Sequence, residues 1–103
     1  MAKFLITYHE GGEMPADPAI REKMVNAFTV WAAGVGGKMI DPGAPVGRAK
    51  SVTSDGVKDG EPDSVGGYTL LSADNLDDAV ELVRNHPFVA RGGTLRVSEV
   101  MAP

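Results

Sequence analysis

A chain of 103 residues, 43% hydrophobic and 23% charged, has the size and composition of one globular domain. Ten basic and fourteen acidic residues give a net charge of −4, and no lysine or arginine cluster forms a nucleic-acid surface. The absence of cysteine excludes disulfides and thiolate chemistry, and the N-terminal apolar run is too short for a signal peptide or a membrane span. We therefore expect a single domain over residues 1–103, located in the cytoplasm, with no nucleic-acid or membrane partner.

The first predicted element is a β-strand over residues 3–9, which ends at a Glu-Gly-Gly turn. Both of its alternating faces carry side chains suited to burial, namely Phe4, Ile6 and Tyr8 on one face and Leu5 and Thr7 on the other. Burial of both faces indicates a helix layer on one side and a subunit contact on the other.

A helix is predicted after the loop over residues 11–16. Asp17 is a favoured N-cap residue, and Pro18 is well tolerated at the first helical position. The helix then carries one apolar stripe at helical spacing, made of Ile20, Met24, Ala27, Phe28 and Trp31. A glycine-rich segment that starts at Gly34 predicts its end.

The central part of the chain is predicted to hold an edge strand and a hairpin. Residues 38–46 contain two prolines and a glycine, which suits a bent edge strand that runs into a loop. Residues 49–58 predict a small hairpin around Asp55-Gly56, a favoured turn pair. A turn-rich connection over residues 59–64 leads to a strand over residues 65–73.

The second helix has the clearest start signal in the chain. Asn75 is the predicted N-cap, and Asp77-Asp78 complement the positive end of the helix dipole. The predicted buried stripe consists of Leu76, Ala79, Val80 and Val83. The same stripe extended by three residues reaches His86, after which Pro87 stops the helix. The last strand is predicted over residues 94–101.

The order of elements predicts an α+β fold. Strand, helix, strand, small hairpin, strand, helix and strand is the ferredoxin-like βαβ…βαβ plan, an antiparallel sheet with two helices on one face. In the last strand Leu95 and Val97 share one face, and the opposite face carries Arg96, Ser98 and Val100. No third helix is predicted to cover the second sheet face, so we expect a second copy to cover it in a two-fold homodimer with a buried inner space.

Five motifs, taken in order and spacing, resemble a known family. They are Trp31 before the glycine-rich helix end, Asp41-Pro42-Gly43-Ala44-Pro45, Gly66-Gly67-Tyr68, Asn75-Leu76-Asp77-Asp78-Ala79, and His86-Pro87-Phe88 leading to Gly92-Gly93. On these motifs the chain resembles the YCII-related proteins over nearly its whole length. The resemblance implies a dimeric α+β barrel; it implies no particular reaction, since most of the family has no assigned function.

The sequence departs from the family pattern at two points, and these limit which functional residues of the family can be transferred to this chain. Members of the DGPF branch have that tetrapeptide in the central loop, where this chain has Asp59-Gly60-Glu61-Pro62. Members that resemble small lyases or dehydrochlorinases place a histidine, paired with an aspartate, on the first helix. The predicted first helix of this chain contains no histidine, so that dyad is not carried over.

Three residues are candidates for acid–base chemistry. His86 lies at a predicted helix end on the inward stripe and can titrate near neutral pH, although capping of the helix C-terminus also explains it. His9 ends the first strand beside a glycine-rich turn, where a solvated loop residue is the alternative. Asp41 can act as a base if burial raises its pKa, or can simply initiate a turn before Pro42.

Other residues are candidates for substrate binding. Arg48 and Arg96 can hold an anion by a bidentate contact. Arg96 is the better candidate because we expect it on the inner sheet face, where an inter-subunit salt bridge is the alternative. Four aromatic side chains are candidates for a pocket that suits a flat ring, namely Tyr8, Trp31, Phe88 and Tyr68. For Trp31 and Phe88 core packing is the stronger interpretation.

The motif content leaves two classes of function open. No metal-ligand spacing, phosphate loop or serine nucleophile motif occurs, so neither a metal nor a cofactor is expected. The first hypothesis is a cofactor-independent enzyme of proton-transfer, lyase or isomerase type, acting on a small aromatic or lactone-like substrate in a dimer pocket. The second is a non-catalytic dimeric module that binds a small ligand or regulates a partner.

Overall fold

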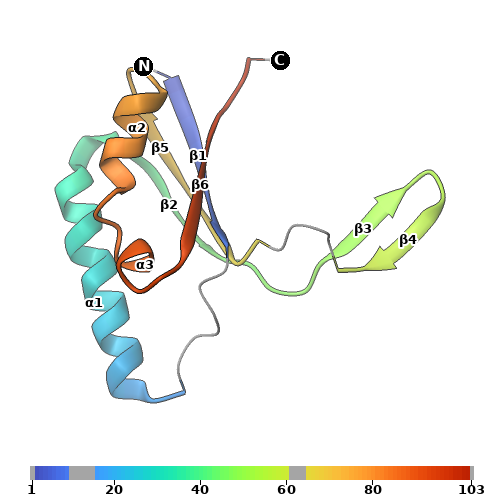
Figure 1. Cartoon of the computed structure of the whole chain (residues 1–103), viewed down its shortest axis with the longest axis horizontal. Helices are drawn as coiled ribbons and strands as arrows, with labels where there is room; N and C mark the ends of the chain where they lie inside the picture. Colours follow the sequence, from blue (N-terminus) through green and yellow to red (C-terminus); the bar gives the residue numbers. More distant parts are fainter. Residues whose placement is uncertain (1, 10–15, 61–64, 103) are drawn as a thin grey trace.

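The computed structural model describes residues 2–9, 16–60 and 65–102. They form a four-stranded antiparallel sheet with the helices packed on one side, and a two-stranded hairpin that projects away from this body (Figure 1). Most of the predicted loop over residues 11–16 and the end of the predicted turn over residues 59–64 lie outside the described residues. Within the described part of the chain, no helix is long and apolar enough to span a membrane.

The sheet has the order β2–β5–β1–β6, and every neighbouring pair is antiparallel. Its strands are β1 (Ala2–His9), β2 (Met39–Pro45), β5 (Gly67–Ala73) and β6 (Thr94–Glu99). The first and fifth strands are therefore central, as the ferredoxin-like plan requires. The predicted α+β fold with both long helices on one sheet face is confirmed (Figure 1).

Both predicted helices begin where the sequence predicts; the first ends at Val35, just beyond Gly34, whereas the second ends at Val83, before its predicted end at His86. They are α1 (Pro18–Val35), the short 3-10 helix η1 (Gly36–Lys38), α2 (Leu76–Val83) and α3 (Pro87–Ala90). The Asp17 carboxylate accepts the Ala19 N–H at 2.9 Å, and the Asn75 side chain accepts the Asp78 N–H at 2.9 Å. Both predicted N-caps are thus confirmed. The one-turn helix α3 is not among the predicted elements.

The core lies between the sheet and the helices. The inward-facing sheet positions, here called the helix face, are Phe4, Ile6 and Tyr8 of β1, Thr69, Leu71 and Ala73 of β5, and Leu95 and Val97 of β6. Trp31 of α1 and Val83 of α2 pack against this face. The predicted stripe of α1 is buried only toward its C-terminal end: Ile20 is 46% exposed and Trp31 8%. The N-terminal turns of α1 extend beyond the sheet, which explains the exposure (Figure 1).

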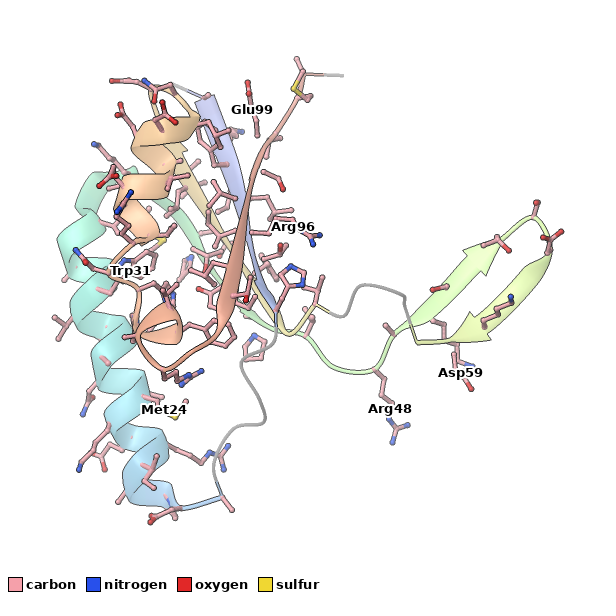
Figure 2. All side chains as sticks on the ribbon, viewed as in Figure 1. Met24, Trp31, Arg48, Asp59, Arg96 and Glu99 are labelled. Atoms are coloured by element: carbon pink, nitrogen blue, oxygen red, sulfur yellow. The ribbon has the colours of Figure 1, made fainter. Side chains whose placement is uncertain are left out.

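The opposite side of the sheet, here called the open face, carries no helix of the described residues (Figure 1). Its positions are Lys3, Leu5, Thr7 and His9 of β1, Tyr68, Leu70 and Ser72 of β5, and Thr94, Arg96 and Ser98 of β6. Leu5 lies directly opposite Leu70 and both are only partly buried. Figure 2 shows Trp31 on the helix side of the sheet and Arg96 on the other side.

The predicted hairpin exists, with its turn moved by one residue. It consists of β3 (Lys50–Thr53) and β4 (Gly56–Asp59), which pair with each other and with no strand of the main sheet. The two-residue turn is Ser54-Asp55, so the predicted pair Asp55-Gly56 is wrong. Gly56 instead begins β4 opposite the last residue of β3, at a backbone φ of 128° that favours glycine.

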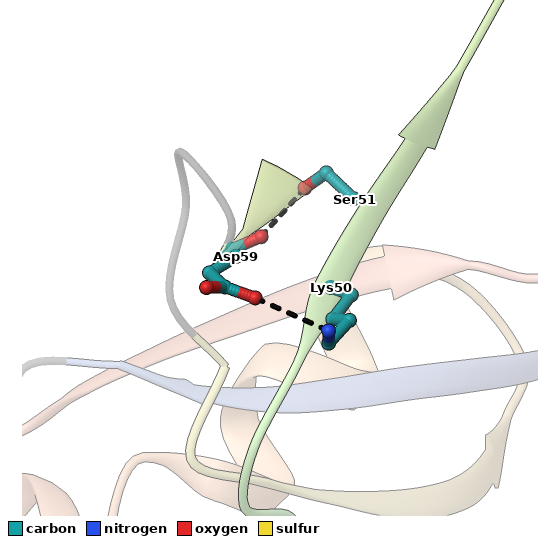
Figure 3. A network of polar contacts seen from close by, with 4 residues as sticks. Lys50, Ser51 and Asp59 are labelled. Atoms are coloured by element: carbon teal, nitrogen blue, oxygen red, sulfur yellow. Dashed lines mark hydrogen bonds and ion pairs between the residues drawn. The ribbon is translucent and has the colours of Figure 1, made fainter. Parts of the chain in front are cut away.

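Polar contacts fasten the base of the hairpin (Figure 3). The Lys50 ammonium lies 3.4 Å from the Asp59 carboxylate, and the Ser51 hydroxyl donates to the Gly60 carbonyl at 2.7 Å. Both ion-pair partners are exposed, so the pair contributes little to stability.

Candidate functional site

His86 is a buried residue, 3% exposed, at the start of α3. Its Nδ1 accepts the Phe88 backbone N–H at 3.0 Å, and its Nε2 lies 2.8 Å from the Tyr8 hydroxyl. The predicted cap at a helix C-terminus is therefore wrong, because the ring caps the N-terminus of the next helix. Pro87 explains the difference: it cannot continue α2, but it is well suited to the first position of a new helix.

The cap fixes the direction of a chain of hydrogen bonds. Since Nδ1 of His86 accepts, the ring proton is on Nε2, which donates to the Tyr8 hydroxyl. Tyr8 then donates to the Thr69 hydroxyl at 2.7 Å, and Thr69 donates to the Pro42 carbonyl at 2.9 Å. This buried polar chain, His86–Tyr8–Thr69–Pro42, runs from α3 through the helix face to the edge strand β2.

The charge states of the buried polar chain agree with this direction. Burial, with a smaller contribution from the positive charge of Arg91, lowers the pKa of His86 to about 4. Burial also raises the pKa of Tyr8 above its ordinary value, against the lowering effect of its hydrogen bond to Thr69. At neutral pH both side chains are therefore uncharged, and each donates one proton along the chain.

Aromatic rings surround the His86 imidazole. The ring centroids of Trp31, Tyr8 and Phe28 lie 4.3, 5.1 and 5.7 Å from it. Phe88 packs edge-on against Tyr8 at 5.1 Å. The predicted ring-binding residues Tyr8, Trp31 and Phe88 thus lie in one packed cluster, and their roles in substrate binding stay a prediction.

A groove of about 710 Å³ is formed by the helices. It runs between α1 and the segment from α2 to α3, and Val30, Trp31, Leu82 and Pro87 are among its lining residues. The Trp31 indole N–H donates to the Leu82 carbonyl at 2.9 Å, which fixes the ring between α1 and α2. None of the three predicted acid–base residues lines this groove.

A second group of polar side chains lies on the open face. Thr7 is opposite Arg96 in the pairing of β1 with β6, and His9 is opposite Thr94. His9 Nε2 lies 2.8 Å from the Thr7 hydroxyl, and His9 is only 6% exposed. The alternative of a solvated loop histidine is therefore wrong. An imidazole, a hydroxyl and a guanidinium occupy neighbouring positions here, and we call Thr7, His9 and Arg96 the open-face cluster.

Asp41 forms a turn within the edge strand. It lies opposite Leu70, and the pairing of β2 with β5 shifts register on both sides of it. Its carboxylate accepts the Gly43 N–H at 2.8 Å, so the turn-forming alternative is confirmed. Gly43 has a φ of 75°, and a Cβ atom there would overlap the Tyr68 carbonyl, so only glycine fits.

The predicted site residues thus fall into two groups instead of one. His86, Tyr8, Trp31 and Phe88 lie on the helix side of the sheet, whereas His9 and Arg96 lie on the open face and Asp41 on the β2 edge. Arg48 is exposed near the hairpin (Figure 2). Thr69 was missed; the signal for it is a hydroxyl at an inward position of a strand that otherwise buries apolar groups. Among the described residues, no three His, Asp or Glu side chains are grouped to hold a metal ion.

No family model and no curated protein matches the sequence. The structure is similar to that of 5-chloro-2-hydroxyhydroquinone dehydrochlorinase from Burkholderia phenoliruptrix AC1100, solved in complex with 2,5-dihydroxybenzoquinone. The TM-score is 0.59 at 22% sequence identity, over 98% of this chain and 95% of the other. The two proteins share a fold. At this level of identity the likeness extends to the fold alone.

Proposed function

We propose that the chain is a YCII-related, cofactor-independent enzyme that binds a small planar organic anion on the open face and moves a proton on it. The open-face cluster is the observation that carries this proposal. Arg96 offers a planar cation for a carboxylate or an ionised hydroxyl, and the His9 imidazole belongs to the side-chain type most often used in acid–base catalysis. The fold shared with a dehydrochlorinase, a small-molecule enzyme, supports this reaction class.

A second copy of the chain completes the site in this proposal. Leu5 and Leu70 are partly buried on the open face, and Tyr68 is 36% exposed. Face-to-face packing of two sheets removes these apolar side chains from water and encloses the open-face cluster. Exclusion of water strengthens the attraction between Arg96 and an anion.

Proton transfer in this proposal falls to His9, with Asp41 as the second candidate. His86 is less suited to it, because it lies on the helix side of the sheet, away from the open face. The buried polar chain ends at the Pro42 carbonyl, which has no proton to pass on. His86 therefore keeps a structural role.

Binding of 2,5-dihydroxybenzoquinone tests the location of the site. We expect the quinone to shift backbone amide NMR signals of β1, β5 and β6, because these strands carry the open face. Arg96→Gln should weaken binding about tenfold, the effect of losing one charge-assisted contact. Arg48→Gln is the matched control and should bind as the wild type does. Equal affinities of wild type and Arg96→Gln, or shifts confined to the helices, would contradict the proposal.

A non-catalytic ligand-binding module is the second candidate function. The observation that favours it is the engagement of the Asp41 carboxylate in its own turn, away from His9 as a dyad partner. Chloride release from 5-chloro-2-hydroxyhydroquinone separates the two candidates. Release that is lost in His9→Gln, with quinone binding retained, supports the enzyme. Quinone binding by the wild type without chloride release supports the module.

A further inference from the structure

We infer that Tyr8 and Thr69 are positioning residues for the turn at Asp41-Pro42-Gly43, which borders the open face. This inference rests on the proposed function only in taking the open face as the site. The link itself is the buried polar chain, which begins on the helix side and ends at the carbonyl of Pro42, within that turn.

The conformation of the turn depends on side-chain contacts, because the pairing of β2 with β5 is interrupted there. The pairing of β2 with β5 joins Asp41 to Leu70 and then Ala44 to Tyr68, so the two residues between have no partner in the ladder. Among the described residues, two side-chain hydrogen bonds reach this interval: the Asp41 carboxylate accepts the Gly43 N–H, and the Thr69 hydroxyl donates to the Pro42 carbonyl. Removal of the second contact takes away the hydrogen bond that joins the turn to β5.

Tyr8 determines where the single proton of the Thr69 hydroxyl points. The His86 ring donates to Tyr8, so Tyr8 must donate onward to Thr69, and the only proton of Thr69 is then directed to Pro42. Without the Tyr8 hydroxyl, His86 retains an unpaired donor and Thr69 is free to rotate. The conformation of the turn is thereby coupled to groups on the opposite side of the sheet.

The coupling matters for the open face because the turn sets the position of Asp41. This residue lies opposite Leu70, whose side chain belongs to the open face. Thr69 reaches the turn from the helix face and contacts it through the Pro42 carbonyl, and Tyr8 acts through Thr69. They therefore act on the site through Asp41, without contact to a ligand.

Hydrogen exchange of the Gly43 amide in the ligand-free protein tests the inference. Tyr8→Phe retains the ring and removes the hydroxyl, and it should speed Gly43 exchange several-fold and shift its NMR signal. Tyr68→Phe, which removes a hydroxyl from the open face of the neighbouring strand, is the matched control and should leave Gly43 unchanged. The exchange of the Leu71 amide, in the centre of the sheet, reports global loss of stability.

A second pair of variants separates positioning from general stability. Thr69→Val should speed Gly43 exchange as Tyr8→Phe does, whereas Thr69→Ser keeps the hydroxyl and should restore the wild-type rate. Unchanged Gly43 exchange in both Tyr8→Phe and Thr69→Val would overturn the inference, as would equal acceleration at Leu71. No ligand is used, so failure here is distinguishable from failure of the quinone titration with Arg96→Gln.

Discussion

The two faces of the same sheet differ in how their polar groups are used. On the helix face, Tyr8 and Thr69 have their hydroxyls in one directed chain of hydrogen bonds, surrounded by fully buried Ile6 and Leu71. The open face carries charged, polar and partly buried apolar side chains together, and no helix of the described residues covers them. We infer from this difference that the helix face stabilises the fold and that the open face is the candidate binding surface.

The two leucines of β5 provide the largest expected contrast between the faces. Leu71 is fully buried in the core, so Leu71→Ala should reduce the free energy of unfolding by about 2–5 kcal/mol. The neighbouring Leu70→Ala, on the open face, should cost about 1 kcal/mol or less in the monomer. Urea denaturation at low protein concentration measures both, and equal losses would contradict the division between the faces.

The pH dependence of stability provides a second, smaller contrast. Above pH 6.5 the His86 ring is neutral in the folded and unfolded chain, so it contributes no pH dependence. Between pH 6.5 and about 4 the unfolded chain takes up a proton that the folded ring, with its lowered pKa, does not. The free energy of unfolding should therefore fall over this range as the pH is lowered.

His86→Asn is the control for this prediction, because asparagine can still cap α3 and does not titrate. Urea denaturation at several pH values should show a smaller loss of stability in the variant between pH 6.5 and 4. His9 is present in both proteins and does not affect their difference. A difference that stays constant from pH 7 to pH 4 would show that His86 titrates normally in the folded chain.

Local signals account for most of the fold. The caps at Asp17 and Asn75, and the alternating faces of β1, each depend on residues close in sequence, and all are confirmed. The sequence did not predict α3 because a proline such as Pro87 has two opposite effects: it ends the helix before it and favours the start of a helix after it. The choice depends on the His86 side chain, which accepts the first available backbone N–H.

The candidate site was less predictable because its contacts join distant residues. The helical stripe predicts that His86 faces inward, but its hydrogen-bond role depends on Tyr8, 78 positions away. The alternation of side chains along β6 correctly places Leu95 and Arg96 on opposite faces of the sheet. It does not separate structural from functional polar residues, because hydroxyls and histidines occur on both faces. That separation required the register of β1 with β5 and β6.

The oligomeric state of two aspartate variants tests the central claim, that the open face meets a second copy of this chain. In sedimentation velocity we expect the wild type and Val30→Asp to be dimers, and Leu70→Asp to be a folded monomer by circular dichroism. Val30 is the matched control because it is 73% exposed on α1, on the opposite side of the sheet. A monomeric wild type at high micromolar concentration, or a dimer that Val30→Asp dissociates and Leu70→Asp does not, would contradict the account.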